Sequence, residues 1–194
     1  MALVQFLNGG SYIGIDACLS SIEWCTAHYS GRDNFRFFHA DVFSTMYNPN
    51  SASTPDKYRF PLDNESIDFI FSTSLFTHLL LGAVDNYLKE MARVLRPGGK
   101  MWNTFMLLDA VSLTVARRFQ RDRPNVYLSV EVPGGLVSLA DNPEALSAQY
   151  TEVVKQLHGQ HGLFIDVIRN GPWSGRPDNL KASYEDVVIA HKSA

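Results

Sequence analysis

The sequence contains few cysteines and none of the common metal-binding patterns. Cys18 and Cys25 are its only cysteines, and on a helix their spacing separates them by about 10 Å along the axis. That separation excludes a disulfide between them unless the helix unwinds. No CxxC or HExxH pattern is present. We therefore expect reduced thiols, a cytoplasmic protein and no bound metal.

Long hydrophobic runs and an excess of positive charge are also missing. No apolar run approaches the ~18 residues that a membrane-spanning helix needs. The apolar start at residues 2–7 has no basic residue before it, and Arg32 is the first positively charged side chain. A signal peptide is therefore not expected. A formal net charge of -3 provides no overall electrostatic attraction to nucleic acid or to an anionic membrane, so neither is an expected partner.

The composition is that of a folded protein with a substantial core. Hydrophobic residues make up 45% of the chain and charged residues 19%, which is typical of globular domains. The length of 194 residues is compatible with one such domain. The sequence therefore predicts a single domain over residues 1–194.

Strand and helix patterns alternate through the first half of the chain. This alternation predicts an α/β fold with a mostly parallel, doubly wound sheet. The apolar run at 67–72 predicts a strand covered on both faces. The last two strands lie close enough to form an antiparallel pair at one edge. Strands are predicted at 11–16, 35–41, 67–72, 100–107, 127–132, 163–169 and 184–191, and helices at 20–29, 83–95, 109–121 and 141–161.

Polar side chains follow three of the predicted strands. Two strands end on Asp16 and Asp41, and a third ends on Ser72, Thr73 and Ser74. In an open α/β sheet, ligands bind at the carboxyl ends of the strands, and a carboxylate accepts hydrogen bonds from the hydroxyls of a ribose. Each aspartate taken alone is more typical of a helix cap or a turn. Together they indicate a nucleoside-binding site.

Four segments resemble the class I S-adenosylmethionine-dependent methyltransferases, whose fold is Rossmann-like. They are residues 12–16, 38–42, 60–70 and 88–99, and the last is the most specific because a helix leads into Leu-Arg-Pro-Gly-Gly and then a strand. The resemblance extends from about residue 8 to residue 108. It is looser toward the C-terminus, where residues 162–169 and 184–192 look like the family's closing pair of strands.

The resemblance implies S-adenosylmethionine as the cofactor and a role for each matching position. Asp16, with Ala17 beside it, corresponds to the acid on the ribose hydroxyls. Asp41 corresponds to the partner of the adenine amino group, and the Val42 backbone N–H to the donor to the ring. Ser72, Thr73 and Ser74 lie where the family's chain passes the methionine part and the reactive methyl group. His78 lies one turn further on, toward the acceptor.

The chain departs from the family at its beginning. The family's first strand and Gly-x-Gly-x-Gly turn are not found, and Gly9, Gly10 and Gly14 precede a strand instead of following one. We therefore interpret the chain as a methyltransferase domain that is N-terminally truncated relative to the family. The missing strand would lie between those ending at Asp16 and Ser72, and an exposed central edge favours self-association.

Several other residues have both a functional and a structural interpretation. His78 is a candidate general base, or it packs the short helix after the strand. His158 and His161 form an H-x-x-H pattern, which a solvated helix end explains as well as a metal pair. Candidates for the acceptor site lie in two loops and an arginine-rich run, each of which also fits ordinary surface or packing roles. These candidates are Tyr47, Tyr58 and Arg59, then Trp173 and Arg176, and Arg117, Arg118, Arg121 and Arg123.

Three functions compete at this point. The first is methyl transfer from S-adenosylmethionine to a small-molecule acceptor. The second is a non-catalytic methyltransferase-like domain that binds a partner through its open sheet edge. The third, a nicotinamide-dependent oxidoreductase, is the weakest because no G-x-G-x-x-G follows a strand. The acceptor and the oligomeric state are not specified by the sequence.

Overall fold

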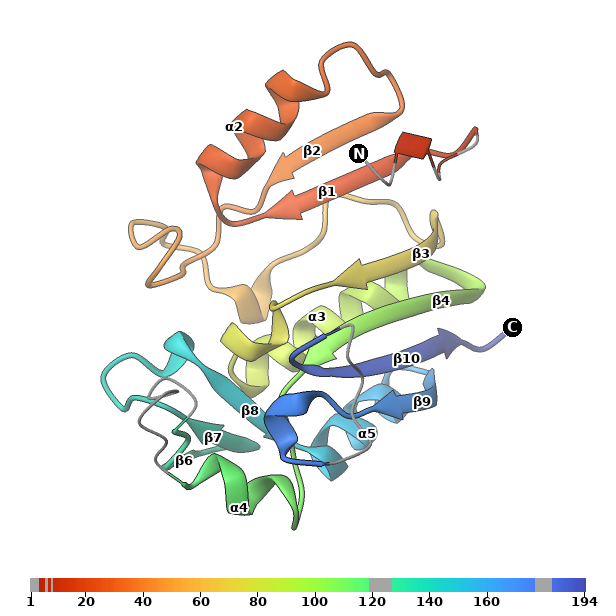
Figure 1. The fold of residues 1–194 in the computed structure, drawn as a ribbon. Helices are drawn as coiled ribbons and strands as arrows, with labels where there is room; N and C mark the ends of the chain where they lie inside the picture. Colours follow the sequence, from red (N-terminus) through yellow and green to blue (C-terminus); the bar gives the residue numbers. More distant parts are fainter. Residues whose placement is uncertain (1–3, 6, 8, 119–126, 177–182) are drawn as a thin grey trace. The chain divides into compact units, whose positions relative to one another are not determined.

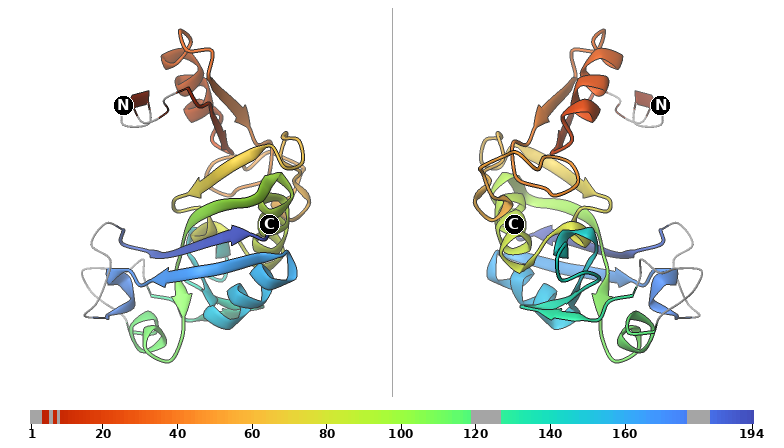
Figure 2. Two further views of the ribbon diagram at one scale, coloured as in Figure 1. Left: turned by 90° about the vertical axis from the view of Figure 1, so that its right-hand side faces the viewer. Right: turned by 90° about the vertical axis from the view of Figure 1, so that its left-hand side faces the viewer.

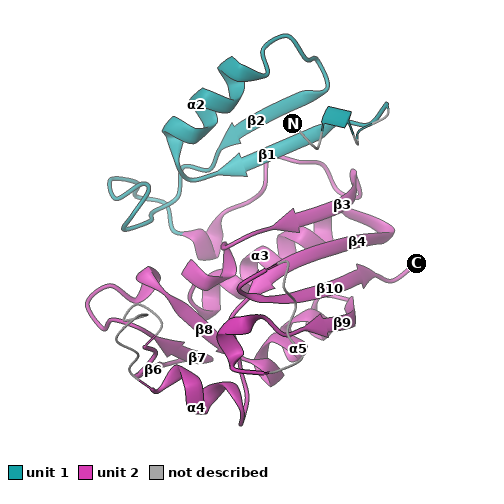
Figure 3. Cartoon of the chain, viewed as in Figure 1, with its two compact units in different colours: residues 1–54 teal, residues 55–194 magenta. Residues whose placement is uncertain are grey.

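The computed structural model describes residues 4–5, 7, 9–118, 127–176 and 183–194. The chain divides into two compact units, residues 1–54 and residues 55–194 (Figure 3). The prediction of one domain over the whole chain stays a prediction. Residues 2, 3 and 6 of the apolar start and the predicted helical residues beyond 118 lie outside the described residues, and so do Arg121 and Arg123.

The first unit is a strand–helix–strand element. Strand β1 (Tyr12–Asp16), helix α2 (Leu19–His28) and strand β2 (Phe35–His39) follow one another (Figure 1). The two strands pair in parallel, with Tyr12 opposite Phe35 and Asp16 opposite His39. All three elements match the predicted ranges within two residues. The parallel register brings the carboxyl ends of both strands to the same edge.

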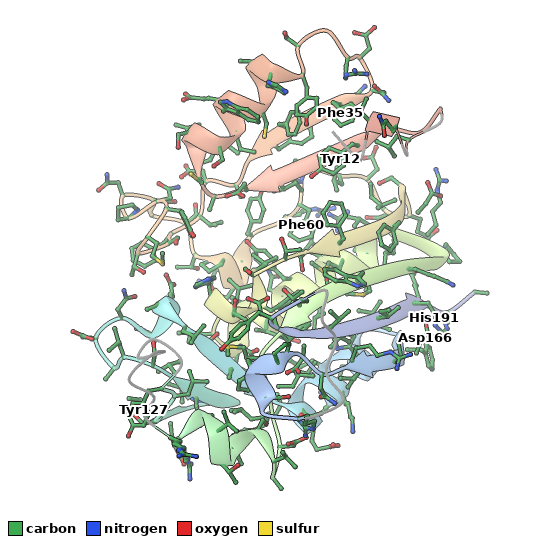
Figure 4. The ribbon with its side chains drawn as sticks, viewed as in Figure 1. Tyr12, Phe35, Phe60, Tyr127, Asp166 and His191 are labelled. Atoms are coloured by element: carbon green, nitrogen blue, oxygen red, sulfur yellow. The ribbon has the colours of Figure 1, made fainter. Side chains whose placement is uncertain are left out.

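Aromatic rings stabilise this first unit. The ring of Phe35 lies 5.6 Å from that of Tyr12 and stacks at 4.9 Å on that of Tyr29 (Figure 4). Gly14 lies beneath the neighbouring ring, because a Cβ atom there would be 2.8 Å from Phe37 Cδ1. A larger residue at position 14 would therefore displace the Phe37 side chain from the strand pair.

The second unit contains a four-stranded sheet in the order β3-β4-β10-β9 (Figure 1). Its strands are β3 (Ile67–Ser72), β4 (Leu95–Phe105), β9 (Leu163–Arg169) and β10 (Asp186–Lys192). Strand β3 is parallel to β4, whereas β10 is antiparallel to both β4 and β9. The predicted antiparallel pair at one edge is confirmed. The sheet, with a parallel β3–β4 pair and an antiparallel strand pair at its edge, confirms the predicted α/β fold class.

Two helices cover one face of this sheet. Helices α3 (Leu81–Val94) and α5 (Thr151–Gln160) lie on the same side of the strands (Figure 2). Val84 and Leu88 of α3 are fully buried and Met91 is 3% exposed, as the apolar spacing of the predicted helix requires. The helix ends at Val94, and the Pro-Gly-Gly turn that follows is part of the range of β4, with Gly98 at a φ of 73°.

The opposite face of the sheet carries exposed aromatic side chains. Phe69 is 55% exposed and Phe71 is 41% exposed, and their rings lie 6.4 Å apart. The prediction that this strand is covered on both faces is therefore wrong. Apolar character alone does not predict which face is buried, because Phe69 and Phe71 are exposed whereas Ile70 between them is partly buried.

A second, smaller sheet replaces part of a predicted helix. Its order is β5-β8-β7-β6, formed by β5 (Leu107–Leu108), β6 (Val130–Val132), β7 (Gly135–Val137) and β8 (Ser147–Tyr150). The predicted helix at 141–161 is thus wrong in its first half, where a 3-10 turn at Pro143–Ala145 leads into β8. Helix α4 is also shorter than predicted, at Ser112–Ala116.

The described part of the second unit also contains the 3-10 turns η1 (Pro55–Lys57), η2 (Phe76–His78) and η5 (Pro172–Ser174). Between η1 and β3, the chain is fastened to α3 by Arg93. Its guanidinium pairs with Glu90 at 2.6 Å and donates to the carbonyls of Phe60 and Leu62. This network fixes the segment that leads into β3. No helix within the described ranges is long and apolar enough to cross a membrane.

Candidate functional site

The end of β1 presents an exposed carboxylate. Asp16 Oδ1 accepts a hydrogen bond of 2.8 Å from the backbone N–H of Cys18, which leaves Oδ2 and further lone pairs for a ligand. The carbonyl oxygen of Asp16 accepts from Ala40 N at 2.8 Å. The carbonyl of Ala17 accepts from His39 Nε2 at 3.2 Å. These two contacts join the loop after β1 to the end of β2.

The end of β2 presents a second exposed carboxylate. Asp41 Oδ1 accepts a 2.9 Å hydrogen bond from the side-chain amide of Asn48, and this bond lowers the pKa of Asp41 below its ordinary value. Ser51 Oγ donates to the Asp41 carbonyl at 3.1 Å. The structure therefore places Asp16 and Asp41 at one edge of the β1–β2 pair. Asn48 and Ser51, from the loop that follows Asp41, hold Asp41 in place.

Val42 lies beside Asp41 but has little exposed surface. Its side chain is 3% exposed, and its backbone N–H already donates to the carbonyl of Ala40 at 2.8 Å. The predicted donation from this N–H to an adenine ring would have to compete with that bond. The two carboxylates, which only accept hydrogen bonds, fit the hydroxyls and amino group of an adenosine without any such competition.

The end of β3 is a compact polar cluster. Ser72 Oγ donates to Asn103 Oδ1 at 2.7 Å, and the Ser74 N–H donates to Thr104 Oγ1 at 2.8 Å. Ser74 Oγ donates to Glu185 Oε1 at 2.8 Å. Thr73 is exposed between them. Ser72, Thr73 and Ser74 thus lie together at the carboxyl end of the strand, as the sequence predicts for a binding turn.

His78 is held by a backbone contact. Its Nδ1 lies 2.9 Å from the carbonyl oxygen of Glu144. Because a carbonyl only accepts, Nδ1 carries the proton and the lone pair of the neutral ring is at Nε2. The side chain is partly exposed in η2. This geometry combines the packing role with a free basic nitrogen, so it leaves both interpretations of His78 open.

The predicted acceptor residues are not all on the surface. Tyr58 packs against Phe60 and Tyr87, with ring centroids 5.9 and 6.4 Å away, and burial raises the pKa of its hydroxyl. Arg59 beside it is exposed, and Tyr47 in the first unit is 50% exposed. Tyr58 therefore helps to hold η1 against α3, whereas Arg59 remains available to a ligand.

Trp173 is part of the hydrophobic core. It is 1% exposed, and its indole N–H donates to Asp186 Oδ2 at 2.7 Å. It packs with Leu136 of the small sheet, Ala116 of α4 and Leu128, which precedes β6. This is the placement of a tryptophan that covers the end of the sheet. Arg176 forms an ion pair with Asp109, which holds the residues just after η5 against the turn before α4.

The two histidines of the H-x-x-H pattern contact different partners. His161 Nε2 lies 2.7 Å from Asp85 Oδ1. His158 is fully buried, and its Nδ1 donates to the Val154 carbonyl at 2.7 Å. Throughout the ranges that the structure describes, no group of three or more His, Cys, Asp or Glu side chains is placed to hold a metal ion.

Burial of His158 predicts a loss of stability in mild acid. Desolvation lowers the pKa of this imidazole to about 4, whereas an unfolded histidine titrates near 6.5. The unfolded state therefore binds a proton first, and stability is lost as the pH falls from about 6.5 toward 4. We expect His158 to account for about 2 kcal/mol of the loss between pH 7 and pH 5.

Urea denaturation at pH 7 and pH 5 measures this effect. The variant His158→Leu is expected to lose less stability between the two pH values than the unmodified protein does. His191, which is partly exposed and paired with Asp166 at 2.8 Å (Figure 4), provides the control variant His191→Leu. An unchanged pH dependence in His158→Leu contradicts the prediction.

The comparison with known families agrees with this arrangement. A family model described as a methyltransferase domain matches residues 2–103, which is just over half of the chain. The chain belongs to this methyltransferase domain family. The match contains the whole first unit, β3, α3 and most of β4, and therefore all the strand ends discussed above.

Solved structures of other methyltransferases have the same fold as this domain. An S-adenosylmethionine-dependent methyltransferase from Methanosarcina mazei aligns with a TM-score of 0.60 at 16% identity, covering 100% of this chain and 87% of that one. A TehB-like enzyme from Corynebacterium glutamicum gives 0.53 at 11% identity, covering 96% and 70%. Geranyl diphosphate C-methyltransferase from Streptomyces coelicolor, in complex with S-adenosyl-L-homocysteine, gives 0.57 at 9% identity, covering 100% and 66%.

Several residues of this methyltransferase domain contact the predicted site residues but were not predicted from the sequence. Among them, His39 and Asn48 support the loops of Asp16 and Asp41. Glu185 accepts a hydrogen bond from the Ser74 hydroxyl, although 111 positions separate the two residues. His39 lies near the end of a predicted strand and Asn48 lies in a predicted loop, so their proximity to the two aspartates is a local signal. No comparable signal exists for Glu185.

Proposed function

We propose that this chain binds S-adenosylmethionine and transfers its methyl group to a small-molecule acceptor. The observation that carries the proposal is the placement of the Asp16 and Asp41 carboxylates at one edge of the β1–β2 pair. Both are exposed and both accept hydrogen bonds only. In this proposal Asp16 accepts from the ribose hydroxyls and Asp41 accepts from the adenine amino group.

The residues of the second unit contribute to the transfer itself. The cofactor supplies a methyl group on a sulfonium, which is already a good leaving group. Ser72, Thr73 and Ser74 orient the methionine part, and such positioning can contribute about 7–11 kcal/mol to catalysis. Where the acceptor carries a proton, His78 Nε2 accepts it, because the Nδ1 proton is held by the Glu144 carbonyl.

Calorimetric titration with S-adenosylhomocysteine tests the proposal. We expect a dissociation constant below ~100 μM, corresponding to more than about 5 kcal/mol of binding free energy. Adenosine should bind more weakly at the same site, because it lacks the methionine part. Absence of any heat at millimolar S-adenosylhomocysteine contradicts the proposal.

A non-catalytic binding domain is the second candidate function. It is favoured by β3, which has one hydrogen-bonded neighbour strand among the described residues and carries the exposed Phe69 and Phe71. Edge strands with exposed apolar side chains pair readily with other chains. The same titration separates the two candidates, because this second function requires no affinity for S-adenosylhomocysteine.

A further inference from the structure

Glu185 joins the polar cluster at the end of β3. Its Oε1 accepts hydrogen bonds from Ser74 Oγ at 2.8 Å and from Thr77 Oγ1 at 3.4 Å. Ser74 is in turn bonded through its N–H to Thr104. One oxygen of the carboxylate is therefore held by two hydroxyl groups, and the side chain is fixed at a defined place.

The backbone around Glu185 is held with equal firmness. The next residue, Asp186, is fully buried and accepts from the backbone N–H groups of Leu107 and Gly171, each at 2.8 Å. Ser74 has a φ of 51°, a left-handed conformation that is uncommon outside glycine. Such conformations persist where surrounding contacts enforce them, and they cluster at functional sites.

The topology places this carboxylate at the ligand-binding edge of the sheet. Strand β10 is antiparallel to β4, so Asp186 at its beginning lies opposite Phe105 at the end of β4. Glu185 therefore lies at the carboxyl ends of β3 and β4. In open α/β sheets this is the edge at which ligands bind.

Among the described residues, Glu185 has hydrogen-bond donors beside it but no ion-pair partner. The ion pairs of the described residues include Glu65, Glu90, Glu131 and Glu152, but not Glu185. The side chain is only partly exposed, and a carboxylate in such a place favours a positively charged partner. Two hydroxyl donors orient the group without neutralising its charge.

We propose that Glu185 binds an ammonium group of the methyl acceptor, so that the acceptor is an amine. This inference rests on the proposed function and deepens it by naming the acceptor class. In the reaction the ammonium first loses one proton to a base or to water. The amine nitrogen then forms a bond to the methyl carbon while the carbon–sulfur bond breaks, and sulfur keeps the electron pair. The products are a methylated ammonium and a neutral thioether.

A matched pair of probes tests the charge preference of this site. We expect n-butylammonium at millimolar concentration to shift the backbone amide NMR signals of Ser74, Thr77 and Glu185. The neutral isostere 1-butanol should not shift them. In Glu185→Gln the apparent affinity for n-butylammonium should fall about tenfold or more, because the hydrogen bond to a charged group is lost. Glu152→Gln, on the surface of α5 and paired with Lys155, should behave like the unmodified protein.

A second readout does not depend on the stability of the variant. In the unmodified protein, the shifts caused by n-butylammonium should weaken as sodium chloride is added, because salt screens the attraction between the ammonium and the carboxylate. Equal shifts with the two probes, or shifts unaffected by Glu185→Gln or by salt, overturn the amine assignment. Parallel titration with S-adenosylhomocysteine keeps the two proposals apart. Binding of S-adenosylhomocysteine without n-butylammonium binding refutes only the amine site, and the reverse result refutes only the proposed cofactor.

Discussion

Replacing Asp186 with alanine is expected to lower the free energy of unfolding by about 3–5 kcal/mol. The carboxylate is fully buried and accepts from the N–H groups of Leu107 and Gly171 and from the indole of Trp173. Burial raises the pKa of Asp186 above its ordinary value, although the three hydrogen bonds act to lower it. Alanine leaves all three donors buried without an acceptor, and each costs about 1–3 kcal/mol.

A graded series of variants makes this expectation specific. Asp186→Asn keeps the shape and one acceptor oxygen, but its amide nitrogen must face at least one N–H donor, so we expect a smaller loss than for alanine. Asp68→Ala is the control, because its side chain is 80% exposed and pairs with Arg96 at the surface. Its loss should stay below about 1 kcal/mol. Urea denaturation measures all three, and a loss below that of Asp68→Ala contradicts the expectation for Asp186→Ala.

The parts of the fold that are visible in the sequence are those specified by local periodicity. Helix α3 is predicted because Val84, Leu88 and Met91 recur at helical spacing, and the structure buries all three. Strands β1 and β2 are predicted because each is a short apolar run ending on a polar turn. In these segments the local pattern and the tertiary environment agree.

The error at 141–161 has the opposite cause. Asn142, Pro143 and Glu144 have the chemistry of a helix start, but this specifies only one 3-10 turn. The next residues, Ser147 to Tyr150, contain no β-branched residue, and only Tyr150 is of a type enriched in strands. They form β8 because β7 and β5 pair with them, and because Gln149 donates to the buried carbonyls of Phe76 and Leu79. Tertiary contacts override the local signal here.

The candidate site was predictable to a similar degree. Asp16 and Ser72 are the last residues of their strands and Asp41 lies two residues after β2, so their positions depend on local structure alone. Trp173 lies in a Gly- and Pro-rich loop that indicates exposure, yet it is buried because Asp186 accepts its indole N–H. The contact of Glu185 with Ser74 requires that β10 return to the end of β4. Such a pairing between remote segments leaves no pattern in a single sequence.

Replacing Asp16 with alanine is expected to weaken binding of S-adenosylhomocysteine about 100-fold, if the proposed function holds. In that proposal the carboxylate accepts a hydrogen bond from each of two ribose hydroxyls, and each hydrogen bond to a charged group contributes about 1.5–3 kcal/mol. Asp16→Asn should weaken binding less, because one oxygen still accepts. Both variants should fold, since Asp16 is exposed and, among the described residues, its side chain accepts a hydrogen bond only from the N–H of Cys18.

A control for Asp16 is available in the same unit. Asp33 is an exposed aspartate just before β2, at the amino end of the strand and so at the edge opposite to Asp16. Asp33→Ala removes one negative charge from the same unit, which controls for the change in net charge. In calorimetry, Asp33→Ala should bind S-adenosylhomocysteine with the affinity of the unmodified protein. The circular dichroism spectra of all variants should match. If Asp16→Ala and Asp33→Ala bind S-adenosylhomocysteine equally well, the ribose is not held at the end of β1, and the assignment of that edge to the cofactor is wrong.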